Sequence, residues 1–577
     1  MEQLESLKER GEAPEWLQEE GYQTLCKGYL LEGETPKDMY KRVARAAKNA
    51  MNYPDSIEQQ IFQYIWNNWI CLSTPVAANL GTDRALPISC FGQSVADKTH
   101  KIFDSYKETA MLTKYGGGIG KYWGDVRGRG AKISKGGTSE GIIPWLKIEE
   151  SVISAVSQSG VRRGASASYL PIEHSDGEEF IDIRRQTGDI SRRCLSTSFH
   201  HGITITDNFM NEALTGNVKN RNLFEQLLKA RVETGEPYVV FIDNANKNLP
   251  AAYTNNGLKV KTSQLCSEIF LTNDEDHTFV CCLSSLNLAR YDEWRTTNVI
   301  QIAVYLLDAV MEEFIQKSSK IEGFENSHRF AVKSRALGLG VLGWHTYLQK
   351  NLIPFDSMEA MTKNAEIFRL IDKNSKEASR ELAVTYGEPE WCKGTGMRNT
   401  HLVAVAPTVS NSLISGGVSQ GIEPIVSNIF MQKSAKGNFI RKNPGLEALL
   451  ESKGFNTFEV WQSINENNGS VKHLKQLNDV EREVFQTARE INQFAIVRQA
   501  GQRQRWIDQG ASVNLFFTVP TELNDLDLKK KLGKYIHEVH LEAWRLGVKS
   551  LYYCRTESPI KGDNVYREAS DCKACEG

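Results

Sequence analysis

The feature that most constrains the fold of this chain is its alternation of amphipathic helical segments with short, buried apolar runs. Apolar residues recur at helical spacing in Met358–Tyr386, which Gly387 closes, and again in Val480–Trp506. Leu523–Leu546 predicts a further helix, and Val548–Arg555 then predicts a strand. Helices that alternate with buried strands imply an α/β architecture.

Composition and charge exclude several classes of protein. The 577 residues include 69 Lys and Arg against 71 Asp and Glu, so a net charge of −2 gives no broad attraction to nucleic acid or to an anionic membrane. The N-terminus has no apolar signal segment, and the most apolar stretch, 299–311, is too short to span a membrane. We therefore expect a soluble, cytoplasmic protein of several folding units, with a helical region over residues 1–70.

The eleven cysteines are too few for a disulfide scaffold, and most of them are expected to be small buried apolar residues. Two patterns are unusual: the adjacent pair Cys281 and Cys282, and the pair Cys572 and Cys575 close to the end of the sequence. The second pair has the spacing of half a zinc site, but no further pair or nearby histidine completes one. The sequence therefore predicts no metal site.

Two patterns match known motifs without the context that those motifs need. Residues 338–343 have the glycine spacing of a dinucleotide-binding turn, but the preceding segment 328–335 is basic and is not a buried strand. We therefore interpret these glycines as a site of close helix packing. His537 and His540 share a helix face without a metalloprotease motif, which favours a solvated helix.

Three segments rich in glycine or hydroxyl residues suit the binding of an anion. They are residues 115–137, 157–165 and 406–417. Glycine lets backbone N–H groups approach a phosphate, and the first segment also supplies basic side chains such as Arg127. Each segment alone is weak support for a phosphate site.

Cys266 and Glu268 lie two residues apart in the segment 263–268, and Gln264 lies two residues before the cysteine. On an extended backbone, alternate residues face the same side, so these three side chains are expected to line one pocket. A thiol, a base and an amide at one site would suit radical chemistry on a polyol. The alternative is a buried structural cysteine beside a surface glutamate.

Further segments occur along the chain in a characteristic order. They are Ser73–Pro75, Ile88–Cys90, the glycine-rich segment 115–137, Leu265–Glu268, Cys281–Leu288, Arg398–Asn399, Ala406–Thr408, Gly421–Pro424, Leu551–Tyr553 and the terminal cysteine pair. Together they resemble the catalytic large subunits of class I ribonucleotide reductases, and the resemblance extends from about Gly28 to Gly577. It implies a ten-stranded α/β barrel of two half-barrels over residues 71–555, with a central finger loop.

The resemblance also implies an active site. By position, Cys266 is the thiyl-radical cysteine and Glu268 the general base for the 3′-hydroxyl of a ribonucleotide. Cys90 and Cys281 are the thiols that close to a disulfide. Because adjacent strand residues face opposite sides, only one of Cys281 and Cys282 can meet Cys90, and we expect it to be Cys281.

The substrate contacts follow from the same resemblance. The family usually has Asn two residues before the radical cysteine, where this chain has Gln264, so the hydrogen bond to the substrate hydroxyls is the uncertain feature. The expected substrate-binding residues carry hydroxyl or amide groups: Thr74, Ser89, Thr408, Ser410, Asn411 and Ser412.

The adjacent tyrosines Tyr552 and Tyr553 look like the relay that passes a radical from a separate small subunit containing a metallocofactor. The large subunit itself then needs no covalently bound cofactor. Two alternatives remain: an adenosylcobalamin-dependent reductase, which lacks such a pair, and a catalytically silent nucleotide-binding regulatory protein, which could lose the thiols and tyrosines.

The resemblance also implies that an effector nucleotide regulates the choice of substrate. Asp97 and Arg127 match positions that meet the ribose and phosphates of a deoxynucleoside triphosphate or ATP effector bound with Mg²⁺, and Gln158 and Arg162 lie on the loop that relays effector identity. Only 27 residues precede Gly28, too few for an ATP-cone, so no overall-activity switch is expected in this chain.

The last segment, 556–577, is polar and is expected to act as a flexible redox tail. Cys572 and Cys575 would carry electrons from thioredoxin or glutaredoxin to the buried disulfide. The expected partners are thus a small subunit, an external dithiol protein, ribonucleoside diphosphates and a second copy of the chain.

Overall fold

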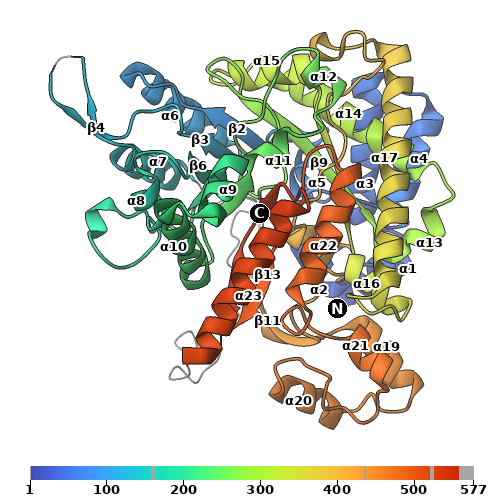
Figure 1. Ribbon diagram of the computed structural model, residues 1–577. Helices are drawn as coiled ribbons and strands as arrows, with labels where there is room; N and C mark the ends of the chain where they lie inside the picture. The colour runs from blue at the N-terminus through green and yellow to red at the C-terminus, as the bar shows by residue number, and fades with distance from the viewer. Residues whose placement is uncertain (1, 135, 158–163, 435–436, 520–525, 558–577) are drawn as a thin grey trace.

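The computed structural model describes residues 2–134, 136–157, 164–434, 437–519 and 526–557. Its largest sheet has nine strands in the order β1-β9-β2-β3-β6-β7-β8-β14, with β10 beside β9 (Figure 1). The strands are β1 Ile70–Leu72, β2 Cys90–Ser94, β3 Gly118–Tyr122, β6 Ala165–Pro171, β7 Phe199–Ile205, β8 Tyr238–Phe241, β9 Phe279–Asn287, β10 Leu337–Leu342 and β14 Ser550–Leu551.

The sheet closes as two half-barrels. In the first half-barrel, β2, β3, β6, β7 and β8 pair in parallel along their length. In the second half-barrel, β10 pairs in parallel with β9. Isolated parallel bridges then join β10 to segment 403–405 and this segment to segment 511–513. Segment 511–513 lies beside β14, where Tyr552 N donates to Val513 O at 2.8 Å. The halves meet antiparallel at β2–β9 and at β8–β14. This confirms the α/β barrel of two half-barrels, with two of its ten positions filled by irregular backbone.

Helices cover the outside of the barrel, so the parallel strands are buried on both faces; β7 is buried along its whole length. One group of helices lies beside the first half-barrel and another beside the second (Figure 1). The first group is α6 Thr99–Lys114, α7 Ile143–Val156, α8 Gly177–Ile181, α9 Asp207–Thr215 and α10 Val218–Thr234. The second is α14 Val299–Ser318, α15 Glu325–Ser334 and α17 Met358–Tyr386.

The expected helical region at the N-terminus is confirmed. It contains α1 Glu2–Glu9, α2 Glu19–Cys26, α3 Pro36–Met51 and α4 Asp55–Trp66, followed by α5 Thr74–Asn79. Thr35 and Asp38 form a reciprocal capping box at the start of α3, with Pro36 in the first turn. The apolar stretch 299–311 lies in α14, which is buried against the barrel, and no helix in the described ranges is long and apolar enough to cross a membrane.

Residues 429–485 form a small lobe with an apolar core of its own, at the lower edge of Figure 1. The lobe contains β11 Ile429–Ser434, β12 Gly437–Lys442, α19 Pro444–Ser452, α20 Phe458–Glu466 and α21 Asp479–Val484. The sequence analysis did not separate it from the barrel. The other elements are β4 Arg129–Lys132, β5 Thr138–Glu140, α11 Ile242–Asn246, α12 Ala251–Thr254, α13 Tyr291–Trp294, α16 Trp344–Lys350, α18 Val409–Ile414, α22 Gln493–Arg503, β13 Leu515–Thr518, α23 Leu526–Arg545, β15 Cys554–Glu557 and four short 3₁₀ turns.

The long helices were predicted with unequal success. Met358–Tyr386 is α17, and Gly387 caps it. The single helix expected over Val480–Trp506 is wrong, because α21 ends at Val484 and the Asn492 side chain caps a new helix, α22, by accepting from Phe494 N. The strand expected over Val548–Arg555 is two short strands, β14 and β15.

The interpretation of His540 as a residue on a solvated helix is also wrong. His540 is fully buried on α23 and accepts a hydrogen bond from Arg231 Nε at 3.2 Å. Burial lowers its pKa to about 3, so the imidazole is neutral. Its environment depends on α10, which lies more than 300 residues earlier in the chain.

Residues 338–343 are not a helix-packing site either. Gly338 and Gly340 lie in β10, where a Cβ at Gly340 would come within 2.6 Å of Ala404 O. The glycines therefore let β10 approach the neighbouring segment 403–405 closely. The basic residues before them belong to helix α15.

Candidate active site

A loop formed by residues 263–270, here called the finger loop, passes through the interior of the barrel. Its passage requires a missing side chain on β3: a Cβ at Gly120 would lie 2.1 Å from Ser263 O and 2.5 Å from Gln264 Cα. A Cβ at Gly118 would lie 3.0 Å from the Leu265 side chain. Gly118 and Gly120, interpreted from sequence as part of an anion-binding segment, therefore make room for the finger loop.

Side chains from several strands hold the backbone carbonyls of the finger loop. Tyr169 on β6 donates its hydroxyl to Gln264 O at 2.6 Å, and Ser550 on β14 donates to Ser267 O at 2.6 Å. Ser512 donates to Cys266 O at 2.5 Å and also lies 3.3 Å from Glu268 Oε2. These bonds fix a loop that contains Ser267 at φ +66°, a left-handed conformation that an unsupported serine rarely adopts.

The finger loop brings Cys266 and Glu268 to one pocket, as expected, but Gln264 does not line that pocket. Gln264 turns back into the loop, where its Oε1 accepts from Cys266 N at 2.9 Å and its Nε2 donates to Glu268 Oε2. The residue that departs from the family pattern thus orients the carboxylate of Glu268 in this structure.

The pocket is a small cavity of about 70 Å³. Five of the six expected substrate-binding residues line it, and Ser412 does not; its hydroxyl donates to Val409 O at 2.9 Å inside α18. The residues that line the pocket are Ser73, Thr74, Pro75, Pro87, Ile88, Ser89, Cys90, Cys266, Glu268, Cys281, Leu283, Ser284, Ser285, Ala406, Pro407, Thr408, Val409, Ser410 and Asn411.

Two further thiols face the same pocket. Cys90 on β2 and Cys281 on β9 are direct partners in the antiparallel register, a position in which Cα atoms lie within the range that a disulfide can span. Cys282 points the other way, and its thiol donates to Leu307 O of α14 at 3.3 Å. Burial raises the pKa of Cys281 well above its ordinary value, so the group is a protonated thiol at neutral pH.

An aromatic cluster lies next to β14. The rings of Tyr552 and Tyr553 are 4.3 Å apart between centroids, and Tyr238 on β8 lies 4.6 Å from Tyr552 and 5.1 Å from Tyr553. The Tyr553 hydroxyl lies 3.5 Å from His200 Nδ1, which is 2.6 Å from a carboxylate oxygen of Glu236. Tyr238, His200 and Glu236 carry no local motif, and the sequence analysis did not identify them.

Two of the expected effector residues form an ion pair at the outer end of the first half-barrel. Arg127 Nε donates to Asp97 Oδ2 at 2.7 Å, and Arg127 also donates to Lys132 O at 3.1 Å. Gln158, Arg162, Cys572 and Cys575 lie outside the described residues. In the described ranges, no group of three or more His, Cys, Asp or Glu side chains could hold a metal ion.

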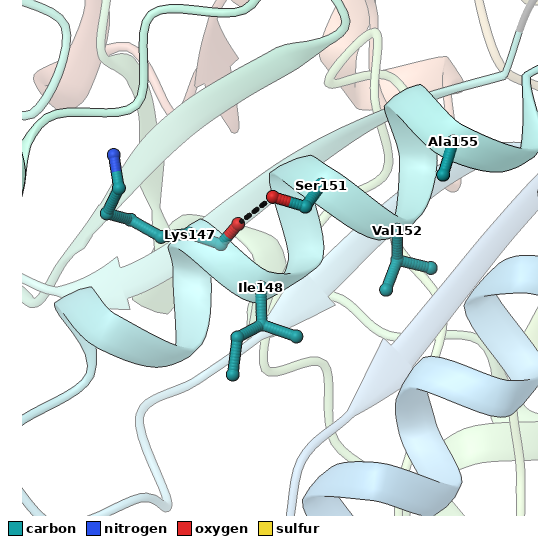
Figure 2. A pocket seen from close by; sticks show the side chains of 5 residues that line it. All are labelled: Lys147, Ile148, Ser151, Val152 and Ala155. Atoms are coloured by element: carbon teal, nitrogen blue, oxygen red, sulfur yellow. Dashed lines mark hydrogen bonds between the residues drawn. The ribbon is translucent and has the colours of Figure 1, made fainter.

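A second, shallow depression lies on the outer face of α7, between the side chains of Lys147, Ile148, Ser151, Val152 and Ala155 (Figure 2). The Ser151 hydroxyl donates back to Lys147 O at 2.9 Å. The depression is mostly apolar and contains no pair of groups that could perform acid–base or redox chemistry.

Comparison with known proteins agrees with this geometry. The family model of the ribonucleotide reductase all-alpha domain matches residues 15–85, and that of the barrel domain matches 88–217, 211–394 and 389–554. The chain is 39% identical to the putative ribonucleoside-diphosphate reductase large subunit of Frog virus 3 over 90% of this chain and 93% of that protein. It is 32% identical to the ribonucleoside-diphosphate reductase large subunit of Invertebrate iridescent virus 3, over 96% and 98% of the two chains.

A solved structure is also similar. The class Id ribonucleotide reductase alpha subunit of Actinobacillus ureae superposes with a TM-score of 0.85 at 40% identity, covering 94% of this chain and 98% of the other. The barrel, the finger loop that crosses it and the matches to both domain models lead to one conclusion: the chain belongs to the ribonucleotide reductase family of oxidoreductases, as a large (α) subunit.

Proposed function

We propose that this chain reduces ribonucleoside diphosphates to 2′-deoxyribonucleoside diphosphates by thiyl-radical chemistry. The observation that carries the proposal is the convergence of three thiols and a carboxylate, from Cys90, Cys266, Cys281 and Glu268, on one pocket. Overall, two thiols supply two electrons and two protons and become a disulfide, while the 2′-hydroxyl leaves as water and C2′ gains hydrogen. Cys266 is not consumed.

Each group has a role that its position supports. The Cys266 thiyl radical takes the 3′ hydrogen atom of the ribose, and Glu268 accepts the proton of the 3′-hydroxyl as general base. Gln264 and Ser512 orient the Glu268 carboxylate through their contacts with its Oε2 atom. Cys90 and Cys281 supply the reducing equivalents, and the Cys266 radical is restored when the hydrogen atom returns to C3′.

The polar groups around the pocket bind the substrate. Thr74, Ser89, Thr408, Ser410 and Asn411 offer hydroxyl and amide groups for the diphosphate and ribose. Thr408 is held at φ +56° and accepts a hydrogen bond from Gly421 N at 2.8 Å, which links the loop before α18 to the Gly421–Pro424 segment. Ser412 supports α18 from within.

The radical enters through the tyrosine pair. Tyr553 is partly exposed and Tyr552 is buried, so the pair leads from the surface towards the finger loop. A separate small subunit with a metallocofactor supplies the oxidising equivalent, and each tyrosine gives up one electron and one proton in turn. An adenosylcobalamin-dependent enzyme would make the radical locally and would not need the pair.

Specificity control is assigned to the region of Asp97 and Arg127. Their ion pair opens to place the Asp97 carboxylate at the ribose and the Arg127 guanidinium at the phosphates of an effector nucleotide with Mg²⁺. Gln158 and Arg162 relay the identity of the effector to the substrate pocket. We also propose a homodimer that covers the apolar face of α7 (Figure 2).

The terminal cysteines complete the cycle. Cys572 and Cys575 reduce the Cys90–Cys281 disulfide by thiol–disulfide exchange and are themselves reduced by thioredoxin or glutaredoxin. Cys572→Ser/Cys575→Ser should lose turnover with the protein reductant but keep a single-turnover burst.

The test is the reduction of CDP with dithiothreitol and the cognate small subunit. The wild-type chain should form dCDP, whereas Cys266→Ser, Tyr552→Phe and Tyr553→Phe should form none and still bind CDP. Activity with adenosylcobalamin in place of the small subunit, or near wild-type activity of either tyrosine variant, would contradict the relay. Absence of any reduction under both conditions would leave a silent regulatory protein as the better description.

A further inference from the structure

The sulfur of Cys281 is held by a side chain that has no part in the chemistry proposed above. Gln509 is fully buried, and its Nε2 lies 3.4 Å from Cys281 Sγ and 2.8 Å from Leu337 O. Its Oε1 accepts a hydrogen bond from Phe270 N at 3.2 Å. One amide group therefore connects β9, β10 and the end of the finger loop.

These contacts fix the orientation of the Gln509 amide. A carboxamide has two N–H donors and one acceptor oxygen. If the amide were reversed, its oxygen would face the Leu337 carbonyl and its NH₂ group would face the Phe270 N–H, and both contacts would be repulsive. With one N–H committed to Leu337 O, the other is directed at the Cys281 sulfur.

Gly338 on β10 also lies beside this sulfur. A Cβ at Gly338 would lie 2.4 Å from Leu283 Cδ2 and 3.1 Å from Cys281 Sγ, both closer than an ordinary van der Waals contact. The missing side chain thus leaves space for the sulfur and for the Leu283 side chain. The neighbouring thiol of Cys282 has a different environment, since it donates to Leu307 O.

We propose that Gln509, together with the space at Gly338, positions the Cys281 sulfur for exchange with Cys90. The inference rests on the proposed pairing of these two cysteines. An N–H donor stabilises a thiolate, which is the form that attacks a disulfide. Gln509 thereby opposes the effect of burial on Cys281. Because the same amide also binds Phe270 N, the position of the sulfur depends on the finger loop that carries Cys266 and Glu268.

The inference can be tested on the full-length chain with Cys572→Ser/Cys575→Ser, so that the terminal thiols do not take part in the exchange. The oxidant is 2-hydroxyethyl disulfide, which is small enough for the pocket: two protein thiols become a disulfide and the reagent yields two molecules of 2-mercaptoethanol. Acid trapping and peptide mass spectrometry report the Cys90–Cys281 disulfide. Gln509→Met keeps the length of the side chain and removes the donor, and it should slow disulfide formation about fivefold.

Gln499→Met is the matched control. Gln499 is also a buried amide, but it bonds to Phe355 O and Trp344 Nε1, away from the pocket. It should lose folding stability and keep the parent rate of disulfide formation. Equal rates for Gln509→Met and Gln499→Met would overturn the inference.

A second variant covers the case in which Gln509→Met does not fold. Gly338→Ala keeps the Gln509 amide but places a methyl group against both the Leu283 side chain and the Cys281 sulfur, so it should slow the same reaction. An unchanged rate in Gly338→Ala would overturn the positioning role. If the parent forms no Cys90–Cys281 disulfide at all, the proposed redox pair itself is wrong. If the parent and the variants form this disulfide at the same rate, the pair is correct and only the role of Gln509 and Gly338 is wrong.

Discussion

The two half-barrels differ in regularity. The first is built from five parallel strands with continuous register, whereas the second contains two positions, 403–405 and 511–513, that make only isolated bridges. Backbone and side-chain groups of the irregular half also bind the finger loop: Gly510 N donates to Glu268 O at 2.9 Å, and the Ser512 hydroxyl donates to Cys266 O. The same segments still pair with each other, since Val405 N donates to Gly510 O and Ser512 N donates to Val405 O, each at 2.9 Å.

The first half-barrel contributes mainly space and rigidity. Gly118 and Gly120 on β3 leave room for the finger loop, and the Tyr169 hydroxyl holds one of its carbonyls. The comparison teaches that the first half-barrel provides the space for the finger loop, whereas the second half-barrel provides more of the hydrogen bonds that hold it. Substitutions in the two halves should therefore fail in different ways.

The largest effect is expected for the adjacent thiols on β9. Cys281→Ser should abolish multiple turnover, because the pocket loses one of the two thiols that form the disulfide, and the chain should fold normally. Cys282→Ser faces α14, where the thiol donates to Leu307 O, and should keep activity while losing about 1–2 kcal/mol of unfolding free energy because a more polar side chain is buried. Steady-state reduction assays and urea unfolding measure both. The opposite pattern would assign the redox role to Cys282.

Gly120→Ala tests whether the finger loop needs the space that β3 leaves for it. Its Cβ would lie 2.1 Å from a backbone oxygen of the finger loop, so the loop must shift, and we expect a loss of about 3 kcal/mol or more in unfolding free energy together with most activity. Gly533→Ala on α23 is the control, because nothing lies within 4 Å of its Cβ and alanine favours a helix. A Gly120→Ala variant as stable as the parent would show that the finger loop does not need β3 to lack this side chain.

The buried carboxylate of Glu236, which lies just before β8 and binds His200 and His201 of β7, can be tested through pH. Burial alone would raise the pKa of Glu236, but His200 and His201 beside its carboxylate hold that pKa well below the ordinary value. A carboxyl with a lowered pKa stabilises the fold above its unfolded pKa of about 4.3, and this contribution is lost as pH falls through the folded pKa.

Glu236→Gln should therefore lower the unfolding free energy by about 1–3 kcal/mol at pH 7, and the loss of stability in acid should become shallower below about pH 4.3. Urea unfolding from pH 3 to pH 7 measures both quantities. Glu466→Gln, at an exposed position on α20, is the control and should leave the pH profile unchanged. A parent-like acid profile for Glu236→Gln would show that the ion pairs of Glu236 with His200 and His201 do not contribute to the acid stability of the fold.

The smallest effect belongs to the single hydrogen bonds of the second half-barrel. Ser512→Ala and Ser550→Ala each remove one donor to a finger-loop carbonyl and should cost about 1 kcal/mol of stability. Because Ser512 also lies beside the Glu268 carboxylate, only Ser512→Ala should alter the pH dependence of kcat. If kcat has the same pH dependence in both variants, Ser512 supports only the backbone of the finger loop and does not orient the Glu268 carboxylate.

Local sequence was sufficient where the determinants are local. Helix α17 has the predicted bounds, because its apolar periodicity and the glycine at its end lie within one segment. The sequence analysis missed the break before α22 because the apolar periodicity continues across it. The Asn492 side chain nevertheless caps a new helix there. Gly338 and Gly340 were misinterpreted because the identity of the packed neighbour, segment 403–405, is not a local property.

The site divides in the same way. By itself, the sequence determined the α/β class, the helical N-terminal region and, through short motifs in a fixed order, the residues Cys90, Cys266 and Glu268 that the fold brings to one pocket. The sequence also led us to expect Cys281 rather than Cys282 at this pocket, and Cys281 lines it. Only the tertiary structure decided that Gln264 turns inward and that Gln509 and Ser512 support the reactive groups. The physical reason is that a hydrogen bond joins atoms close in space, and Gln509 and Ser512 lie more than 220 residues along the chain from their partners Cys281 and Cys266.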